Sequence, residues 1–283
     1  MILGKNLRRA VSVGISAMLF FTGCASDDSP DTGNEKEFNI DFGEIYTLSD
    51  ADLETRTENG TDIVFSGEEV YLIEEPGTYR LTGECTGQLQ IDVQDEMVHL
   101  VLQDVEMKSS NGPVIYVKSA AKVIITVPEG SSSILTDSGY YAEDTAKACI
   151  YSEDDLTING SGSLQVNGYY KDAIRTKDTL KILGTNLTVQ AKGDGLRGND
   201  GVIIRTSALD IQCEGTGIYT EREGKENKGF VDMASGTVNI IAGEYGIDAA
   251  ENVYIHNCQA DIYGIVQNIS CSGEQYIEEG CLE

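Results

Sequence analysis

The sequence contains no tryptophan, only four prolines and only two histidines among its 283 residues. No two cysteines form a CxxC pair, and neither His99 nor His256 lies near a cysteine at the spacing of metal ligands. Zinc sites draw on clustered cysteine and histidine ligands, so a zinc site is not expected. Beyond residue 40 no stretch has the apolar spacing of a long amphipathic helix, which argues against a helical fold.

Basic side chains are also scarce. The chain has 20 lysines and arginines against 47 aspartates and glutamates, for a net charge of −27. Proteins that bind nucleic acid carry a basic patch, so this balance excludes nucleic acid as a partner. The acids are scattered between apolar segments, and two interpretations stay open. They form a solubilising surface, or some of them are carboxylate ligands of divalent cations.

The N-terminus has the organisation of a targeting segment. Three basic residues precede an apolar stretch over 10–21, which is too short to span a membrane. Gly23-Cys24 follows, and this junction resembles a bacterial lipobox. We therefore expect a lipoprotein signal peptide over 1–23 and lipidation of Cys24. An ordinary secretory signal with an incidental cysteine is the alternative.

The mature protein is then expected outside the cell, lipid-anchored to the outer face of the bacterial cell membrane. Residues 24–40 are polar and predict a flexible tether, and residues 41–283 form the folded domain. Most of the remaining cysteines fall at strand positions and are expected to be small core residues. Cys271 and Cys281 lie in the C-terminal tail and could pair, but the sequence does not determine the connectivity.

From residue 148 onward the sequence repeats with a period of about 22 residues. Asp172 to Asp194 is 22 positions, and Asp194 to Thr216 is 22 again. Each repeat carries apolar i, i+2 pairs, such as Leu156/Ile158 and Leu180/Ile182, and a third short apolar segment. Parallel stacking of such coils buries the apolar columns. We predict an all-β fold, a right-handed parallel β-helix of ~22-residue coils with three strands per turn. A β-sandwich is the alternative, but it does not account for the regular period.

Two insertions break the period, one over 135–147 and one over 220–229. In solenoids, insertions lie in loops on one side and often border a binding face.

Stacking the repeats produces columns of charged side chains. One acidic column contains Asp154, Asp178 and Asp200, and a second places Asp172 over Asp194. Two carboxylates about 5 Å apart repel by roughly 3 kcal/mol at an effective dielectric of about 20. A divalent cation such as calcium, held between coils, would offset this repulsion. The alternative is that each aspartate caps a turn by accepting a backbone N–H.

A basic column adjoins the acidic ones, with Arg175 over Arg197 and Lys177 nearby, and with Tyr151 before the arginines and Tyr219 after them. No histidine is placed beside a serine or cysteine in the repeat, so no nucleophilic site is evident. A carboxylate pair for glycoside hydrolysis stays open, because the separations are not known from the sequence. Arginines beside acidic columns are also similar to the layout of β-helical pectate lyases, which use calcium.

Several segments in order resemble one family, the clostridial cell-surface lipoproteins described as carbohydrate-binding domain-containing proteins. They include residues 77–93, 99–137, 150–168 and 171–182. The family's repeated Asp-Gly-Ile-Lys/Arg step is similar to Asp172-Ala173-Ile174-Arg175 and Asp194-Gly195-Leu196-Arg197, whereas Thr216 and Tyr245 depart from it in the next two coils. The resemblance implies a calcium-containing β-helix, related in fold to polysaccharide lyases, that binds plant polysaccharides without cleaving them.

The resulting hypothesis is a cell-surface protein that binds plant cell-wall polysaccharide, with pectin or polygalacturonate favoured and cellulose second. Neutral glucans usually stack on flat aromatic rings, and without tryptophan the 14 tyrosines would supply them. The expected carbohydrate-binding residues are Tyr151, Arg175, Lys177, Arg197 and Tyr219. The expected calcium ligands are Asp154, Asp172, Asp178, Asp194 and Asp200. The competing hypotheses are a calcium-dependent lyase or hydrolase, and a structural or adhesin solenoid with no glycan ligand.

Overall fold

The computed structural model describes residues 42–283 except 57, 69 and 143–145. The chain divides into two units, Met1–Thr47 and Leu48–Glu283. The first unit contains a one-turn helix, α1 (Phe42–Ile45), and the expected signal peptide and tether lie outside the described residues. In the described part of the chain, neither helix has the length and apolar character needed to cross a bilayer.

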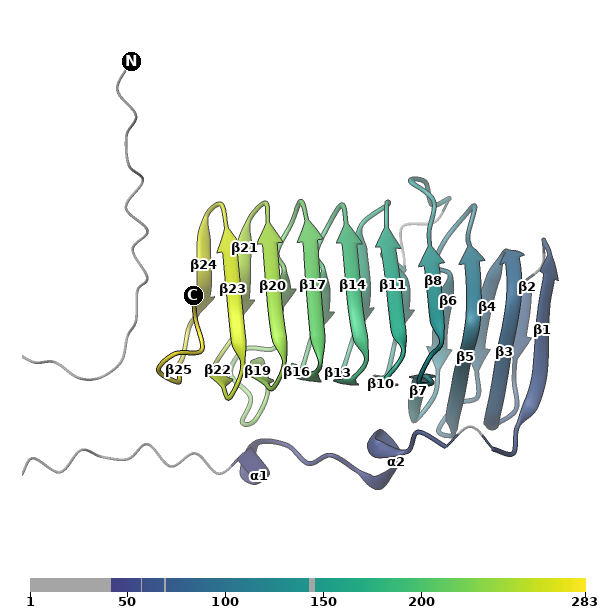
Figure 1. Ribbon diagram of the computed structural model, residues 1–283, viewed down its shortest axis with the longest axis horizontal. Coiled ribbons are helices and arrows are strands. Elements are labelled where there is room, and N and C mark those ends of the chain that lie inside the picture. Colours follow the sequence, from purple (N-terminus) through teal and green to yellow (C-terminus); the bar gives the residue numbers. More distant parts are fainter. Residues whose placement is uncertain (1–41, 57, 69, 143–145) are drawn as a thin grey trace, which may run out of the picture. The chain divides into compact units, whose positions relative to one another are not determined.

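The second unit is a right-handed parallel β-helix, as predicted (Figure 1). Its coils follow one another along the chain from β1 at one end to β24 and β25 at the other. Every strand pairs in parallel with the strand of the next coil, and the strands line three faces. Face 1 consists of β2 (Val70–Ile73), β4 (Gln88–Asp92), β6 (Ile115–Ser119), β9 (Ala148–Ser152), β12 (Asp172–Thr176), β15 (Leu196–Gly198), β18 (Ile218–Tyr219), β21 (Tyr245–Ala249) and β24 (Gln267–Cys271).

The larger sheet bends to form the other two faces. Face 2 consists of β1 (Thr61–Gly67), β3 (Gly77–Thr86), β5 (Met97–Lys108), β7 (Lys122–Val127), β10 (Asp155–Gly160), β13 (Thr179–Gly184), β16 (Gly201–Thr206), β19 (Phe230–Ala234), β22 (Val253–His256) and β25 (Gln275–Ile277). Face 3 consists of the end of β5, then β8 (Ser132–Thr136), β11 (Ser163–Gly168), β14 (Asn186–Ala191), β17 (Ala208–Cys213), β20 (Thr237–Ala242) and β23 (Gln259–Gly264). Three strands per turn are therefore confirmed.

The core consists of aliphatic columns, as the repeat predicted. Ile158 pairs with Ile182, and Ile182 pairs with Ile204 in the next coil; all three are fully buried. On face 1 the corresponding column is Ile150, Ile174, Leu196, Ile218 and Ile247. Because the side-chain period of a strand is 2, a slip of one residue would turn every one of these side chains outward. The apolar pairs thus fix the register, and the register places the outward side chains.

A short strap from the start of the second unit covers part of face 2. It contains α2 (Asp50–Leu53), which Ser49 begins with a capping box. The Asp52 carboxylate is fully buried and forms ion pairs with Lys122 at 2.8 Å and Lys181 at 3.1 Å, on strands β7 and β13. Asn159 of β10, between them, donates to the backbone carbonyl oxygens of Asp52 and Glu54, both at 2.9 Å. The strap therefore joins three consecutive coils.

We predict that Asp52→Asn destabilises the fold by about 2 kcal/mol, because it leaves two partly buried lysines without their charge partner. The melting temperature should fall by about 4–8 °C at pH 7. Burial alone would raise the pKa of Asp52, but hydrogen bonds from Lys122, Thr157 and Ser49 outweigh it and lower that pKa well below its usual range. The difference from wild type should hold above about pH 4 and shrink as the pH falls further. Asp50→Asn, in the same helical turn but exposed, is the control; equal losses in both variants would contradict the prediction.

Candidate functional site

A ladder of aromatic and basic side chains runs along the outside of face 1. The register places five residues of consecutive coils in one outward column: Tyr116, Tyr151, Arg175, Arg197 and Tyr219. Neighbouring members are one strand spacing apart, ~4.8 Å. Four of the five were expected from the repeat. Tyr116 was missed because the 135–147 insertion separates its coil from the periodic region; the inward positions of Ile115 and Val117 on either side were its only sequence signal.

Arg197 is held on three sides. Its guanidinium donates to Asp194 Oδ2 at 3.3 Å and to Glu221 Oε2 at 2.8 Å, and it lies over the Tyr219 ring at 4.4 Å from the centroid. Glu221 belongs to the 220–229 insertion. The insertion thus fixes the orientation of one member of the ladder.

Arg175 is much less constrained. Among the residues that the structure describes, its guanidinium makes no hydrogen bond, and the nearest acid is Asp172 Oδ2 at 3.6 Å. A guanidinium carries five N–H donors in a planar fork that matches a carboxylate. Arg175 therefore has hydrogen-bonding capacity left for a ligand, and its side chain is partly exposed on the outer surface of the ladder.

Tyr151, which precedes the arginines in the ladder, is covered by other side chains. Tyr151 is only 2% exposed, because it packs with Ala146 and Ala148 at the end of the 135–147 insertion. It contacts the Tyr116 ring edge-on at 5.7 Å between centroids, and its hydroxyl donates to Glu153 at 3.2 Å. The structure thus places Tyr151 in the expected column but presents no ring face to a ligand. Of the two rings, only Tyr116 is partly open.

Lys177 and Glu153 form a second outward row beside the ladder, joined by an ion pair at 2.5 Å. The 135–147 insertion also carries tyrosines to this side of the molecule. Tyr141 stacks on Tyr170 at 4.2 Å, while Tyr140 and Tyr169 are exposed. Both insertions therefore border face 1 but at opposite edges, because 135–147 lies between β8 and β9 and 220–229 lies between β18 and β19. The expectation that they lie on one side was wrong.

The Asp172 and Asp194 carboxylates each bridge to the next coil. Asp172 Oδ1 accepts the Asp194 N–H at 3.0 Å, and Asp194 Oδ1 accepts the Thr216 N–H at 2.9 Å. Their other oxygens face Arg175 and Arg197. Burial raises the pKa of Asp172 to about 6, and the neighbouring Asp194 charge adds to the rise. These contacts match the alternative interpretation, in which each aspartate acts as a cap by accepting a backbone N–H of the next coil.

The Asp154, Asp178 and Asp200 column lies in the turn between faces 1 and 2. Asp154 accepts the Ala120 N–H at 2.8 Å, and Asp200 pairs with Arg222 at 2.7 Å and with Lys228, both from the 220–229 insertion. Asp178 differs, since its carboxylate accepts no hydrogen bond from any described residue. Burial raises its pKa, and the neighbouring carboxylates, Asp155 first, add to the rise.

These contacts limit which of the expected calcium ligands still have an oxygen available for a cation. Within the described ranges, no group of three or more aspartate, glutamate, histidine or cysteine side chains gathers as a metal site. Asp172, Asp194 and Asp200 already have partners, whereas Asp178 and one oxygen of Asp154 retain ligand capacity. Calcium is a hard cation that also takes carbonyl and water oxygens. Of the expected ligands, Asp178 and Asp154 are the ones that would hold a calcium ion, and they would need other oxygens to complete its coordination.

The two histidines lie away from the ladder. His99 Nε2 is 2.6 Å from Thr126 Oγ1, and His256 Nε2 is 2.9 Å from Asp232 Oδ1; both histidines belong to face 2. The basic groups on face 1 are arginines and Lys177, and an arginine stays protonated in proteins. The ladder itself therefore offers positive charge and hydrogen-bond donors, and the group beside it whose pKa approaches neutrality is Asp172, next to Arg175.

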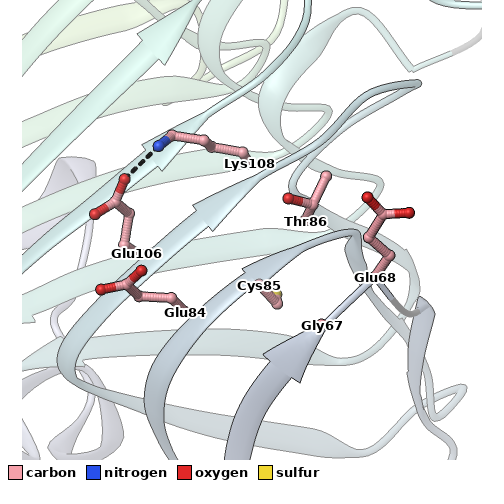
Figure 2. Close-up of a pocket in the computed structure, with 7 residues that line it drawn as sticks. All are labelled: Gly67, Glu68, Glu84, Cys85, Thr86, Glu106 and Lys108. Atoms are coloured by element: carbon pink, nitrogen blue, oxygen red, sulfur yellow. Dashed lines mark hydrogen bonds and ion pairs between the residues drawn. The ribbon is translucent and has the colours of Figure 1, made fainter.

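A pocket of about 290 Å³ lies near Gly67, at the N-terminal end of the β-helix (Figure 2). Glu84 and Glu106, on the paired strands β3 and β5, direct their carboxylates to the same side, and Lys108 forms an ion pair with Glu106 at 2.5 Å. Sequence reasoning did not single out these residues, because the first coils lack the 22-residue period. The pocket contains no member of the ladder.

Comparison with known proteins identifies a matching family, a relative and a related solved structure. A sequence model of the family described as "Carbohydrate-binding domain-containing protein" matches residues 66–277. A relative of that description from Acetivibrio thermocellus is 33% identical over 279 residues, which cover 96% of each chain. A solved structure, the gadolinium derivative of a "polysaccharide lyase-like protein" from C. thermocellum, superposes with a TM-score of 0.74. It is 34% identical, and the match covers 78% of this chain and 98% of that one.

Proposed function

Because the chain belongs to the family of carbohydrate-binding domain-containing proteins, we propose that face 1 binds an acidic polysaccharide of the plant cell wall, such as polygalacturonate. The observation that carries the proposal is Arg175: its side chain is 19% exposed although its Nε is buried, and its guanidinium makes no hydrogen bond to the described residues. A bidentate contact with a uronate carboxylate would use its planar fork. Arg197, one coil further along, presents a second guanidinium to the same chain of sugars.

Tyrosines on both sides of the arginines support a sugar ligand. Tyr219 and Tyr116 are partly exposed, and Tyr140 and Tyr169 are exposed on the bordering turns. Aromatic rings offer an apolar surface against the C–H faces of sugars while the hydroxyl stays hydrated. The same rings are the reason to keep cellulose, a neutral glucan, as the second candidate ligand.

Calcium has a definite role in this proposal. A chain with a net charge of −27 repels a polyuronate, and the two arginines offset only part of that charge. Asp178 and Asp154 would hold the cation through their uncommitted oxygens, and a uronate carboxylate would supply a further ligand. When bound, calcium neutralises the stacked carboxylates of protein and polymer and so links the two.

The proposal makes the protein a binder, and the main alternative is a calcium-dependent lyase. A polysaccharide lyase removes a proton from the sugar, which needs a group that accepts it near neutral pH. The arginines of the ladder do not deprotonate, and both histidines lie on face 2. Asp172, beside Arg175 and with a pKa raised to about 6, is the group on face 1 that could accept such a proton. The family description supports binding, whereas the name of the solved relative, "polysaccharide lyase-like", keeps the lyase as the hypothesis to test.

We predict that Arg175→Ala lowers affinity for polygalacturonate about tenfold in the presence of calcium, because one bidentate, charge-assisted contact is lost. Arg175→Lys should be intermediate, since it keeps the charge but not the fork. Affinity is measured by depletion from solution onto the insoluble polymer, with cellulose in parallel. Arg80→Ala, which removes an arginine of face 2 that pairs with Asp62, is the matched control.

Three outcomes of this experiment would overturn parts of the proposal. Equal affinity of wild type and Arg175→Ala would remove Arg175 from the site. Retention on neither polymer would favour a structural solenoid without a glycan ligand. Absorbance from unsaturated uronate with wild type, lost in Arg175→Ala, would establish a lyase.

Calcium should raise the melting temperature of metal-free wild type by about 5 °C at saturating concentration, because a ligand that binds only the folded state stabilises it. Asp178→Asn should lose most of this gain. Asp261→Asn, an exposed aspartate of β23, should retain it. An unchanged melting temperature after verified removal of metal would mean that the aspartate columns act only as caps.

The N-terminal segment supports attachment of this domain to the outer face of the bacterial membrane through Cys24. We predict that Cys24→Ala leaves the protein unprocessed or releases it from the membrane fraction, because the thiol is the site of lipidation. Fractionation followed by immunoblotting measures the distribution. Normal processing and full membrane retention of the variant would rule out the lipid anchor.

A further inference from the structure

Two cysteines meet at the C-terminal end of the β-helix. Cys258 directly precedes β23, and Cys281 lies in the tail after β25. Cys258 is 9% exposed and Cys281 is 4% exposed, and both belong to the apolar core. They are 23 positions apart, about one coil, so the tail returns over the preceding coil.

Backbone contacts fix this approach. Ala260 and Leu282 form a parallel bridge, in which the Ala260 N–H donates to the Cys281 carbonyl at 2.7 Å and the Glu283 N–H donates to the Ala260 carbonyl at 3.1 Å. The Cys258 N–H also points at Cys281 Sγ, at 3.5 Å. The bridge places Cys281 opposite Gln259, so Cys258 lies one residue along the strand from the position that faces Cys281. A strand spacing of ~4.8 Å and a rise of ~3.3 Å per residue put the two Cα atoms about 6 Å apart, within the separations of about 4.4–6.8 Å that a disulfide spans. The backbone therefore needs no large movement to allow a bond.

We propose that Cys258 and Cys281 form a disulfide that fastens the C-terminal tail onto the last coil. The sequence suggested Cys271 and Cys281 as a pair, but the structure places Cys281 beside Cys258 instead. Cys271 Sγ faces the backbone carbonyls of Gly273 and Glu274, at 3.6 and 3.7 Å. Cys149 and Cys213 lie on β9 and β17, several coils from the tail.

The oxidant in the proposal is a disulfide, either a small molecule or a thiol-oxidising protein. The Cys281 thiolate attacks one sulfur of that disulfide, forms a mixed disulfide and releases one thiol. The Cys258 thiolate then attacks the Cys281 sulfur, which forms the intrachain bond and releases the second thiol. The two protein thiols lose two protons and two electrons, and the oxidant gains them as two thiols.

Burial of the Cys258 thiol determines when the thiol–disulfide exchange occurs. It raises the pKa of Cys258 to about 12, and the neighbouring Cys281 adds to the rise, so the folded protein holds little Cys258 thiolate at pH 7. The bond should therefore form while the tail is still open, during folding, and only slowly afterwards. Once formed, it holds the tail over the core of the coil that contains β23.

The test compares full-length protein refolded with oxidised glutathione and with a reductant. After denaturation, an alkylating reagent should label two fewer cysteines in the oxidised sample, and peptide mapping should recover Cys258 linked to Cys281. Oxidised wild type should melt about 5 °C above reduced wild type. Cys258→Ser and Cys281→Ser should both abolish the linked peptide and this difference, whereas Cys271→Ser should keep them.

Two results would overturn the proposal. One is equal labelling of oxidised and reduced wild type, which means that the thiols do not react with each other. The other is a linked peptide that contains Cys271, which restores the pairing suggested by the sequence. Because mapping reads the bond itself, a variant that folds poorly does not obscure the result for wild type.

Discussion

The in-register hydrogen bonding of each coil to the next is the constraint on which the rest of the structure depends. It places every side chain over its counterpart one strand spacing away, both inside and outside. Inside, the consequence is favourable, since Ile158, Ile182 and Ile204 stack as one continuous apolar column. Outside, the same rule stacks like charges, and the molecule must compensate at each position where the repeat places an acid or a base.

The compensation takes two forms. Asp172 and Asp194 accept backbone N–H groups of the following coil, so each carboxylate stabilises the stacking that creates it. The 220–229 insertion brings Arg222 and Lys228 to Asp200 and Glu221 to Arg197. Among the described residues, Asp178 receives neither form and Arg175 has only its ion pair with Asp172 at 3.6 Å. These are the positions where the proposed cation and uronate would act. The proposed site thus lies where the stacked charges are least compensated by the protein itself.

The periodic half of the sequence predicted much of the fold and part of the proposed site. The coil length, the three faces, the inward columns and the Arg175/Arg197 stack follow from counting positions, because a solenoid converts sequence spacing directly into neighbours. The features that were missed all depend on segments outside the period. The burial of Tyr151 depends on the 135–147 insertion, the Asp52 ion pairs depend on a strap more than 60 residues away from Lys122, and Cys281 reaches Cys258 through an irregular tail. No spacing rule predicts where such segments lie.

A rigid ladder has a specific consequence for a polymeric ligand. The separation of Arg175 and Arg197 is set by the backbone and cannot adapt, so affinity depends on whether successive ligand groups match that separation. Arg197 is held by two carboxylates and a tyrosine ring, whereas Arg175 has one ion pair, with Asp172 at 3.6 Å. In the proposed site, a strongly held guanidinium beside a less constrained one would contact successive units of a sugar chain. The proposed calcium ion would extend the same principle, because its flexible coordination tolerates a mismatch that two stacked guanidinium groups do not.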